Sequence, residues 1–141
     1  KSGGSELNVQ RALECIYGYA VGIDLTRRDL QVEAKEKGRP WDTAKGFDSS
    51  APLSPIKQAK CHEPEDARIW LEVNGELKQD AKLSDMIWSV PEMISILSDY
   101  FELAAGDVIM TGTPAGVGSV QTGDVMSAFI EGLGELEVLV N

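Results

Sequence analysis

The chain has 141 residues, of which 43% are hydrophobic, enough for one globular domain with its own core. Its 13 Lys and Arg residues and 23 Asp and Glu residues give a formal net charge of −10. Nucleic acids and anionic membranes bind proteins through clustered basic residues, so this charge argues against both as partners. No apolar run approaches the length of a bilayer-spanning helix.

The first elements predicted from the N-terminus are a short helix and a buried strand. One face of the helix carries the apolar residues Val9, Ala12, Leu13 and Ile16. Cys15 lies beside this face, so we expect its thiol to be in the core. Residues 17–23 are small, apolar and suited to a strand, which places Asp24 at the end of a buried strand.

A second helix should follow directly. The TRRD sequence at residues 26–29 has the spacing of a capping box, so we predict a helix from about residue 27 to Gly38 and Pro40. The strand end and the first helical turn then direct Asp24, Arg28 and Gln31 into one volume. Two interpretations remain open here: a structural ion pair of Asp24 with Arg28, or a site that combines a carboxylate, a cation and an amide.

Basic residues gather between residues 27 and 45, where the net charge is +2 in a chain of −10. Such an island can focus a small anion, although an exposed helix face with pairs such as Glu33 with Lys37 explains part of it. Lys45 stands between small residues in the turn-rich segment 40–55. It can therefore reach inward or remain in solvent.

The second half of the chain is expected to form antiparallel strands. Alternating apolar residues over 67–79 meet an Asn-Gly pair at residues 74 and 75, which predicts a hairpin with a type I′ turn. Residues 125–132 and 135–140 predict two closing strands. Between these hairpins, Ser89 and Glu92 have capping-box spacing. The helix that follows has an apolar stripe formed by Met93, Ile94, Ile96, Leu97, Tyr100 and Phe101.

A glycine-rich loop after residues 107–110, which are read as a strand, is a candidate anion cradle. Glycines let backbone N–H groups approach a ligand, and Thr111 and Thr113 add hydroxyl donors. The glycines are Gly106, Gly112, Gly116 and Gly118. Their spacing fits neither a Walker loop nor a dinucleotide fingerprint, and an ordinary tight connection remains an alternative.

Taken in order, these segments resemble the fumarylacetoacetate hydrolase family, in particular its acylpyruvase and oxaloacetate decarboxylase branch. The segments that carry the resemblance are GYAVGIDLTRRDLQ, KGRPWDTAKGFDSSAPLSP, IWLEVNGELKQ, DMIWSVPEMISILS and GDVIMTGTPAGVG, followed by TGD. The resemblance implies an α+β, mainly β fold of mixed β-sandwich or roll type. It also implies a homodimer, in the bacterial cytoplasm or in the eukaryotic cytosol or mitochondrion.

The resemblance also implies roles for individual residues. Asp24 is similar to a carboxylate ligand of a catalytic Mg²⁺ or Mn²⁺. Lys45, Arg28 and Gln31 resemble the catalytic and substrate-binding side chains of the family. Thr113 resembles the residue that holds the substrate carboxylate, with Gly112 beside it in the same loop. Ser49 and Thr111 are weaker matches.

The chain also departs from the family pattern, because the two other metal ligands, a Glu-x-Glu pair, belong upstream of its first residue. Neither Glu72 and Asp80 nor Glu135 and Glu137 stand where the family places this pair. The lid His and Glu are upstream too, and His62 is read as a surface loop residue. We therefore expect residues 1–141 to be a single catalytic domain that lacks its N-terminal part. Either the sequence is a fragment of a larger protein, or the natural chain lacks these elements and is inactive. The two cysteines, Cys15 and Cys61, fit a reducing compartment.

The activity implied is Mg²⁺- or Mn²⁺-dependent cleavage of a C–C bond in a short 2-oxo acid through a metal-bound pyruvate enolate. Hydrolysis of an acylpyruvate and decarboxylation of oxaloacetate both fit this chemistry. The alternatives are a metal-dependent isomerase or hydratase of unsaturated 2-oxo diacids and a non-catalytic scaffold of the same fold.

Overall fold

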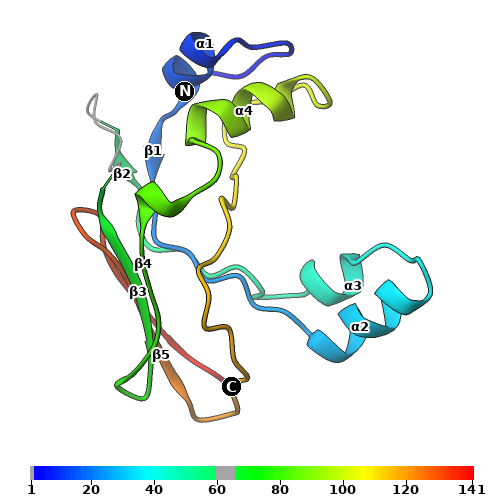
Figure 1. Ribbon diagram of the computed structural model, residues 1–141, viewed down its shortest axis with the longest axis vertical. Coiled ribbons are helices and arrows are strands. Elements are labelled where there is room, and N and C mark those ends of the chain that lie inside the picture. Colours follow the sequence, from blue (N-terminus) through cyan, green and yellow to red (C-terminus); the bar gives the residue numbers. More distant parts are fainter. Residues whose placement is uncertain (1, 60–65) are drawn as a thin grey trace.

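A computed structural model describes residues 2–59 and 66–141, so the predictions for Cys61 and His62 lie outside the described residues. It confirms the α+β, mainly β class, with antiparallel sheets and a few short helices (Figure 1). The helices are α1 Val9–Cys15, α2 Arg28–Glu36, α3 Asp42–Lys45, the 3₁₀ helix η1 Leu83–Asp85, and α4 Val90–Ser98. The strands are β1 Gly18–Tyr19, β2 Lys57–Gln58, β3 Arg68–Val73, β4 Glu76–Lys82, β5 Val125–Ile130 and β6 Gly134–Leu139.

The larger sheet has the strand order β4-β3-β5-β6, with every neighbouring pair antiparallel. Asn74 and Gly75 join β3 to β4 with φ angles of 52° and 77°, which confirms the predicted type I′ turn. The Asn74 side chain donates to Asp124 Oδ1 at 2.8 Å and accepts from the Val125 N–H at 2.9 Å. The tip of the hairpin is thereby tied to the start of β5, and β5 and β6 confirm the predicted closing strands.

One face of this sheet forms the main core. Met126, Ala128 and Ile130 alternate along β5 and are buried, as expected for a strand with one covered face. They pack with Val21 and Ile23, which belong to the segment that leads to Asp24. The core therefore fixes the chain immediately before the first candidate site residue.

A second, smaller core lies between α1 and α4, which sit together at one end of the molecule in Figure 1. The predicted capping box is confirmed, because the Ser89 N–H donates to Glu92 Oε2 at 2.8 Å and the Glu92 N–H donates to Ser89 Oγ at 3.4 Å. Ser98 is 1% exposed, and its hydroxyl accepts from the Leu7 N–H at 2.8 Å. Both helices are thus held by side chain to backbone bonds as well as by packing.

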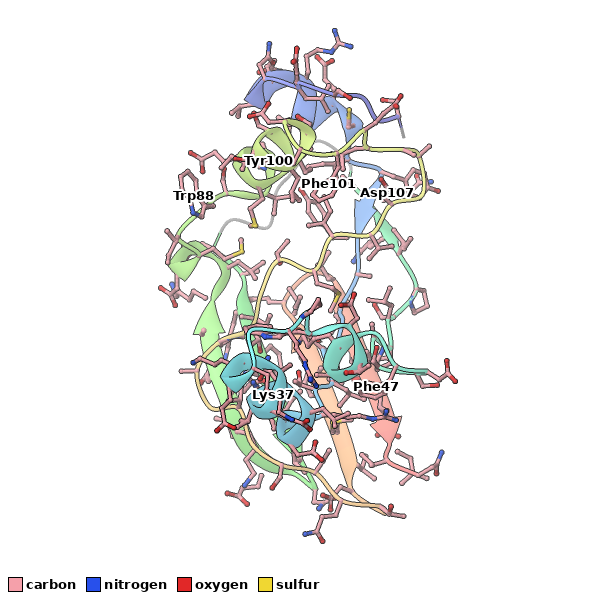
Figure 2. The ribbon with its side chains drawn as sticks, turned by 90° about the vertical axis from the view of Figure 1, so that its right-hand side faces the viewer. Lys37, Phe47, Trp88, Tyr100, Phe101 and Asp107 are labelled. Carbon is pink, nitrogen blue, oxygen red and sulfur yellow. The ribbon has the colours of Figure 1, made fainter. Side chains whose placement is uncertain are left out.

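Part of the predicted core is wrong. The helix α4 ends at Ser98, so Tyr100 and Phe101 leave the stripe and are 77% and 63% exposed. Figure 2 shows Tyr100, Phe101 and Trp88 around this end of the molecule. Other members of the predicted apolar faces are also exposed: Val9, Leu13 and Ile96. Cys15 is half-buried, and the Ser2 hydroxyl donates to its sulfur at 3.6 Å.

Two predicted strands are also corrected. Only Gly18 and Tyr19 of residues 17–23 form a strand, followed by an isolated bridge from Gly22 to Leu53. Residues 107–110 form no strand, since no neighbouring described segment offers them a ladder of backbone bonds. Both segments are extended, so their apolar residues imitate a strand pattern. No helix of the described part of the chain has the length and apolar character to cross a membrane.

Candidate active site

Lys45 forms the centre of the first group of candidate residues. It lies in the last turn of α3, and its Nζ donates to Asp24 Oδ2 at 2.5 Å and to Thr26 Oγ1 at 2.9 Å. The Arg27 N–H donates to the Ala44 carbonyl at 3.0 Å, and Ala44 is fully buried. Because its neighbour in the chain is fixed in this way, Lys45 is directed toward Asp24 and Thr26, although its side chain stays 35% exposed.

Asp24 is not buried, contrary to expectation. Its side chain is 39% exposed, and the ion pair is with Lys45 and not with Arg28. The reason is alternation along this segment: Ile23 and Leu25 pack on the main core and donate to the Pro52 and Ser50 carbonyls at 3.1 and 2.8 Å, so Asp24 between them faces the opposite side. The carboxylate is therefore accessible to a ligand from solvent while one of its oxygens is held by a cation.

The start of α2 also differs from the prediction. The residue at the N-cap position is Arg27, which makes no side-chain cap bond, so the expected capping box at residues 26–29 is wrong. The Thr26 hydroxyl instead accepts from Lys45. Arg27 extends over the Phe47 ring, with its guanidinium carbon 4.3 Å from the ring centroid. This cation–π contact joins the start of α2 to the loop after α3.

Arg28 and Gln31 meet in the first turn of α2, where Arg28 Nη1 donates to Gln31 Oε1 at 2.8 Å. Their proximity is confirmed. Among the described residues, however, no hydrogen bond joins this pair to Asp24 or Lys45. Ser49, the weaker match, is exposed in the loop after α3 and has a φ of 61°, a conformation that is uncommon outside glycine.

The glycine-rich loop lies across β4. Gly116 has a φ of 98°, and a Cβ added there would be 2.0 Å from the Lys78 carbonyl oxygen. Gln79, on the same strand, donates from Nε2 to Thr113 Oγ1 at 3.0 Å and to the Pro114 carbonyl at 2.7 Å. Close backbone approach and an amide side chain thus hold the loop. Its proposed contact with an anion stays a prediction.

The segment before Asp24 and the loop with Thr113 lie side by side. Gly22 faces Met110, since a Cβ added at Gly22 would be 3.3 Å from Met110 Cε. Gly22, Gly112 and Thr113 also line one small cavity above β3 and β5. Its volume is about 40 Å³, room for no more than a few water molecules. The fold therefore brings the two candidate segments together, although no hydrogen bond among the described residues joins Thr113 to the Asp24 group.

Asp24 suits a hard cation, because its exposed carboxylate has a second oxygen that no other described residue bonds. The described residues contain no group of three or more His, Cys, Asp or Glu side chains that could hold a metal ion. Asp24 can therefore supply one ligand of a divalent cation, and further ligands must come from elsewhere.

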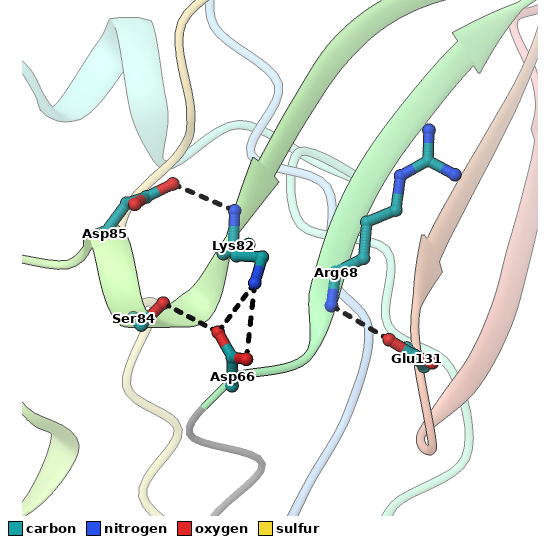
Figure 3. Close-up of polar contacts among 6 residues, drawn as sticks. All are labelled: Asp66, Arg68, Lys82, Ser84, Asp85 and Glu131. Carbon is teal, nitrogen blue, oxygen red and sulfur yellow. Dashed lines mark hydrogen bonds and ion pairs between the residues drawn. The ribbon is translucent and has the colours of Figure 1, made fainter.

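Asp80, one of the other carboxylates that the sequence drew attention to, has a structural partner. Asp80 accepts two bonds from Arg68, at 2.8 and 3.0 Å, and these bonds lower the pKa of Asp80. Figure 3 shows a similar network beside it, in which Lys82 bonds Asp66 at 3.1 and 3.2 Å and lowers the pKa of Asp66. These pairs fasten β4 to the start of β3. The oxygens of both carboxylates are already bonded to a basic side chain, so they are poor candidates for metal ligands.

Gln79 is the residue of this site that sequence reasoning missed. It belongs to the IWLEVNGELKQ segment, which was read only as a hairpin. The available signal was an uncharged amide between the charged Lys78 and Asp80, and in the structure Gln79 is half-buried while both neighbours are exposed. A polar residue that is partly buried needs hydrogen-bond partners, and here the loop supplies them.

Known protein families and proteins are similar to almost the whole chain. The family described as fumarylacetoacetate (FAA) hydrolase, C-terminal, matches residues 2–141. A fumarylpyruvate hydrolase of Ralstonia sp. is 45% identical over 137 residues, which cover 97% of this chain and 71% of the relative. The mitochondrial oxaloacetate tautomerase of Rattus norvegicus is 47% identical over 123 residues, which cover 86% of this chain and 56% of the relative.

A solved structure is similar over almost the whole chain. The crystal structure of fumarylpyruvate hydrolase from Pseudomonas aeruginosa, in complex with Mn²⁺ and pyruvate, superposes with a TM-score of 0.95 and 49% sequence identity. The match covers 98% of this chain and 60% of that protein. This chain thus spans between 56% and 71% of the length of these relatives. It belongs to the fumarylacetoacetate hydrolase family and corresponds to the C-terminal part described by the family.

Proposed function

We propose that the protein is a metal-dependent enzyme that acts at C3 of a short 2-oxo acid. The observation that carries the proposal is the position of Lys45, whose ammonium group bridges Asp24 and Thr26 beside the segment that faces the glycine-rich loop. The named relatives support the substrate class, because their names include fumarylpyruvate and oxaloacetate. The complex of one of them with Mn²⁺ and pyruvate supports a divalent cation.

The specific reaction that we propose is cleavage of the C3–C4 bond, by hydrolysis of an acylpyruvate or by decarboxylation of oxaloacetate. The electron pair of this bond stays on C3 and is delocalised onto the 2-oxo oxygen, and a proton then binds C3. In hydrolysis, water oxygen bonds to C4 and gives a carboxylic acid. In decarboxylation, C4 leaves as CO₂. Pyruvate is the common product.

Each candidate side chain has a task in this scheme. Asp24 would hold Mg²⁺ or Mn²⁺, which supplies Lewis acidity toward the 2-oxo oxygen when bound. Lys45 places a positive charge near the developing negative charge and can deliver the proton to C3. The Thr113 hydroxyl donates a hydrogen bond to the substrate carboxylate. Gly112, beside it, allows the backbone to approach the substrate closely. Arg28 and Gln31 orient the substrate as a bonded pair.

A second candidate reaction is the keto–enol tautomerisation of oxaloacetate, favoured by the name of the rat relative. It moves a proton between C3 and the 2-oxo oxygen and breaks no C–C bond. The same lysine can carry this proton. Loss of the enol absorbance without formation of pyruvate would identify tautomerisation, whereas formation of pyruvate identifies cleavage. The expected homodimer is a separate proposal, which sedimentation of the full-length protein tests.

The decisive experiment measures consumption of oxaloacetate and acetylpyruvate by the full-length protein with Mg²⁺, with Mn²⁺ and with EDTA. We expect EDTA to abolish turnover, and Lys45→Gln to lower kcat by roughly 10²–10⁴-fold. Asp24→Asn should raise the metal concentration needed for activity. The matched controls are Lys37→Gln and Asp99→Asn, which make the same changes on exposed residues away from the site. Equal rates with metal and with EDTA, in all variants, would refute the proposal.

A further inference from the structure

We propose that Gln79 is a positioning residue that sets the direction of the Thr113 hydroxyl, so that its proton points to the substrate carboxylate. This inference rests on the proposed function, because it assigns Thr113 to that carboxylate. It adds a residue on β4 to a site otherwise built from loops and from α2 and α3.

The orientation of the Gln79 amide follows from its second partner. The Pro114 carbonyl oxygen only accepts hydrogen bonds, and it lies 2.7 Å from Gln79 Nε2. The amide nitrogen must therefore face the loop, since the amide oxygen would be repelled there. Both N–H groups of this nitrogen are then engaged, one with Pro114 and the other with Thr113 Oγ1 at 3.0 Å.

The bond from Gln79 also determines which part of the Thr113 hydroxyl remains available to a ligand. A threonine hydroxyl has one proton and two lone pairs. Because Gln79 donates to it, one lone pair is used and the proton remains available. No other described residue bonds this hydroxyl. The proton can therefore be donated to an anion, which is the task that a carboxylate-binding threonine must perform.

The position of the loop makes this arrangement durable. The Gly116 backbone lies against the Lys78 carbonyl, so closely that an added Cβ would be 2.0 Å from its oxygen. Thr113 is thus held over the residue next to Lys78, which is Gln79. Gln79 is half-buried, and its bond to the Pro114 carbonyl is partly buried, which protects this bond from competing water.

The test replaces the donor by an acceptor of nearly the same shape. In Gln79→Glu the ionised carboxylate can only accept hydrogen bonds. The Thr113 hydroxyl therefore donates its hydrogen bond to this new carboxylate in place of the substrate carboxylate. We expect pyruvate to bind the Mn²⁺-loaded, full-length protein roughly 10- to 100-fold more weakly by calorimetry. Gln79→Met removes both bonds but leaves the proton available, and should weaken binding only about 2- to 10-fold. Gln10→Glu, on the exposed side of α1, is the matched control for the added charge.

A double-mutant cycle separates positioning from a structural role. In the wild-type background, Thr113→Val should weaken pyruvate binding. In the Gln79→Glu background it should cost almost nothing further, because the hydroxyl proton is already withdrawn from the ligand. If Gln79 only braces the loop, Gln79→Met will weaken pyruvate binding as much as Gln79→Glu, because both variants remove the two bonds, and that result overturns the inference.

The remaining outcomes are also decisive. If Thr113→Val weakens binding while Gln79→Glu behaves like Gln10→Glu, the inference is wrong and the proposed function stands. If the wild-type protein neither binds pyruvate with Mn²⁺ nor consumes 2-oxo acids, the proposed function fails and the inference fails with it. Hydrogen exchange of residues 112–118 reports independently whether the loop keeps its place in each variant.

Discussion

Replacement of Gly116 by alanine would test how the glycine-rich loop is held on β4. Two separate costs are expected. The φ of 98° is strained for any residue with a Cβ, at about 1–3 kcal/mol. In addition, the new Cβ would be 2.0 Å from the Lys78 carbonyl oxygen, and the contact must open beyond 3.0 Å. The loop must therefore move by about 1 Å, and Thr113 moves with it.

Two other glycines of the same loop separate these costs. Gly112 has a φ of 110° with nothing within 4 Å of an added Cβ, so Gly112→Ala carries the strain without the clash. Gly118 has neither the strain nor a close neighbour. We expect the free energy of unfolding in urea to change by less than about 1 kcal/mol in Gly118→Ala. It should fall by about 1–2 kcal/mol in Gly112→Ala and by more in Gly116→Ala.

The functional consequence of the shift can be measured with the same proteins. A displacement of about 1 Å at a substrate-positioning group can lower kcat/KM by roughly 100-fold. We expect a loss of this size for Gly116→Ala on oxaloacetate, with Gly118→Ala unchanged. Hydrogen exchange over residues 112–118 should become faster in Gly116→Ala. If Gly116→Ala and Gly112→Ala are equally stable, the close approach to β4 is not what holds the loop, and the reasoning fails.

Three further predictions concern the scaffold. Met126→Ala, at a side chain 2% exposed, should lower the free energy of unfolding in urea by about 2–5 kcal/mol, and a loss below about 1 kcal/mol would contradict the core assignment. Asn74→Gly should raise the pKa of Asp124 toward its ordinary value, because the hydrogen bond from the Asn74 side-chain amide is the main cause of the lowered pKa of Asp124. A carboxyl NMR titration that shows no change would exclude this cause. Bonds from Ser89 lower the pKa of Glu92, so the carboxylate stabilises the fold above its ordinary pKa of 4.5, and this contribution is lost as pH falls below that value. The melting temperature of Glu92→Gln should therefore depend less on pH in this acidic range than that of the wild type, and parallel curves would argue against it.

Local patterns predicted the elements whose bonds are local. The Asn-Gly turn needs only two residues that tolerate positive φ, and both hairpin strands formed where expected. The Ser89 and Glu92 capping box closes within one helical turn. In both cases the partners lie within a few residues of each other, so the sequence contains the whole interaction.

Patterns that depend on distant partners were less informative. Thr26 has the spacing of a helix cap, but its hydroxyl bonds Lys45, which is 19 residues away. Residues 107–110 look like a strand and have no strand to pair with in the described chain. Asp24 follows the buried Ile23, yet it alternates with Ile23 and Leu25, which pack on the core and bond residues 50–52, and so it faces away from the core. Each error concerns contacts between residues far apart in the sequence, which a local pattern does not contain.

In the candidate site, too, the local contact was predictable and the long-range contact was not. The sequence predicted that Arg28 and Gln31 share one face of a helix, and they are bonded. It could not predict the bond from Gln79 to Thr113, whose partners are 34 residues apart and belong to a strand and a loop. The resemblance to a family supplied roles for single residues. The geometry supplied the contacts among them.

The pairing of α1 with α4 has a consequence for how the polypeptide folds. The buried bond from the Leu7 N–H to Ser98 Oγ joins residues 91 positions apart, and Gly4 bridges Leu103 in the same region. During synthesis, α1 cannot dock on α4 until α4 has left the ribosome. Contacts of such long sequence separation slow folding, because a large loop must close before they form. Until α4 emerges, the side of α1 that packs against it stays without this cover, and it is there that we expect chaperones to bind.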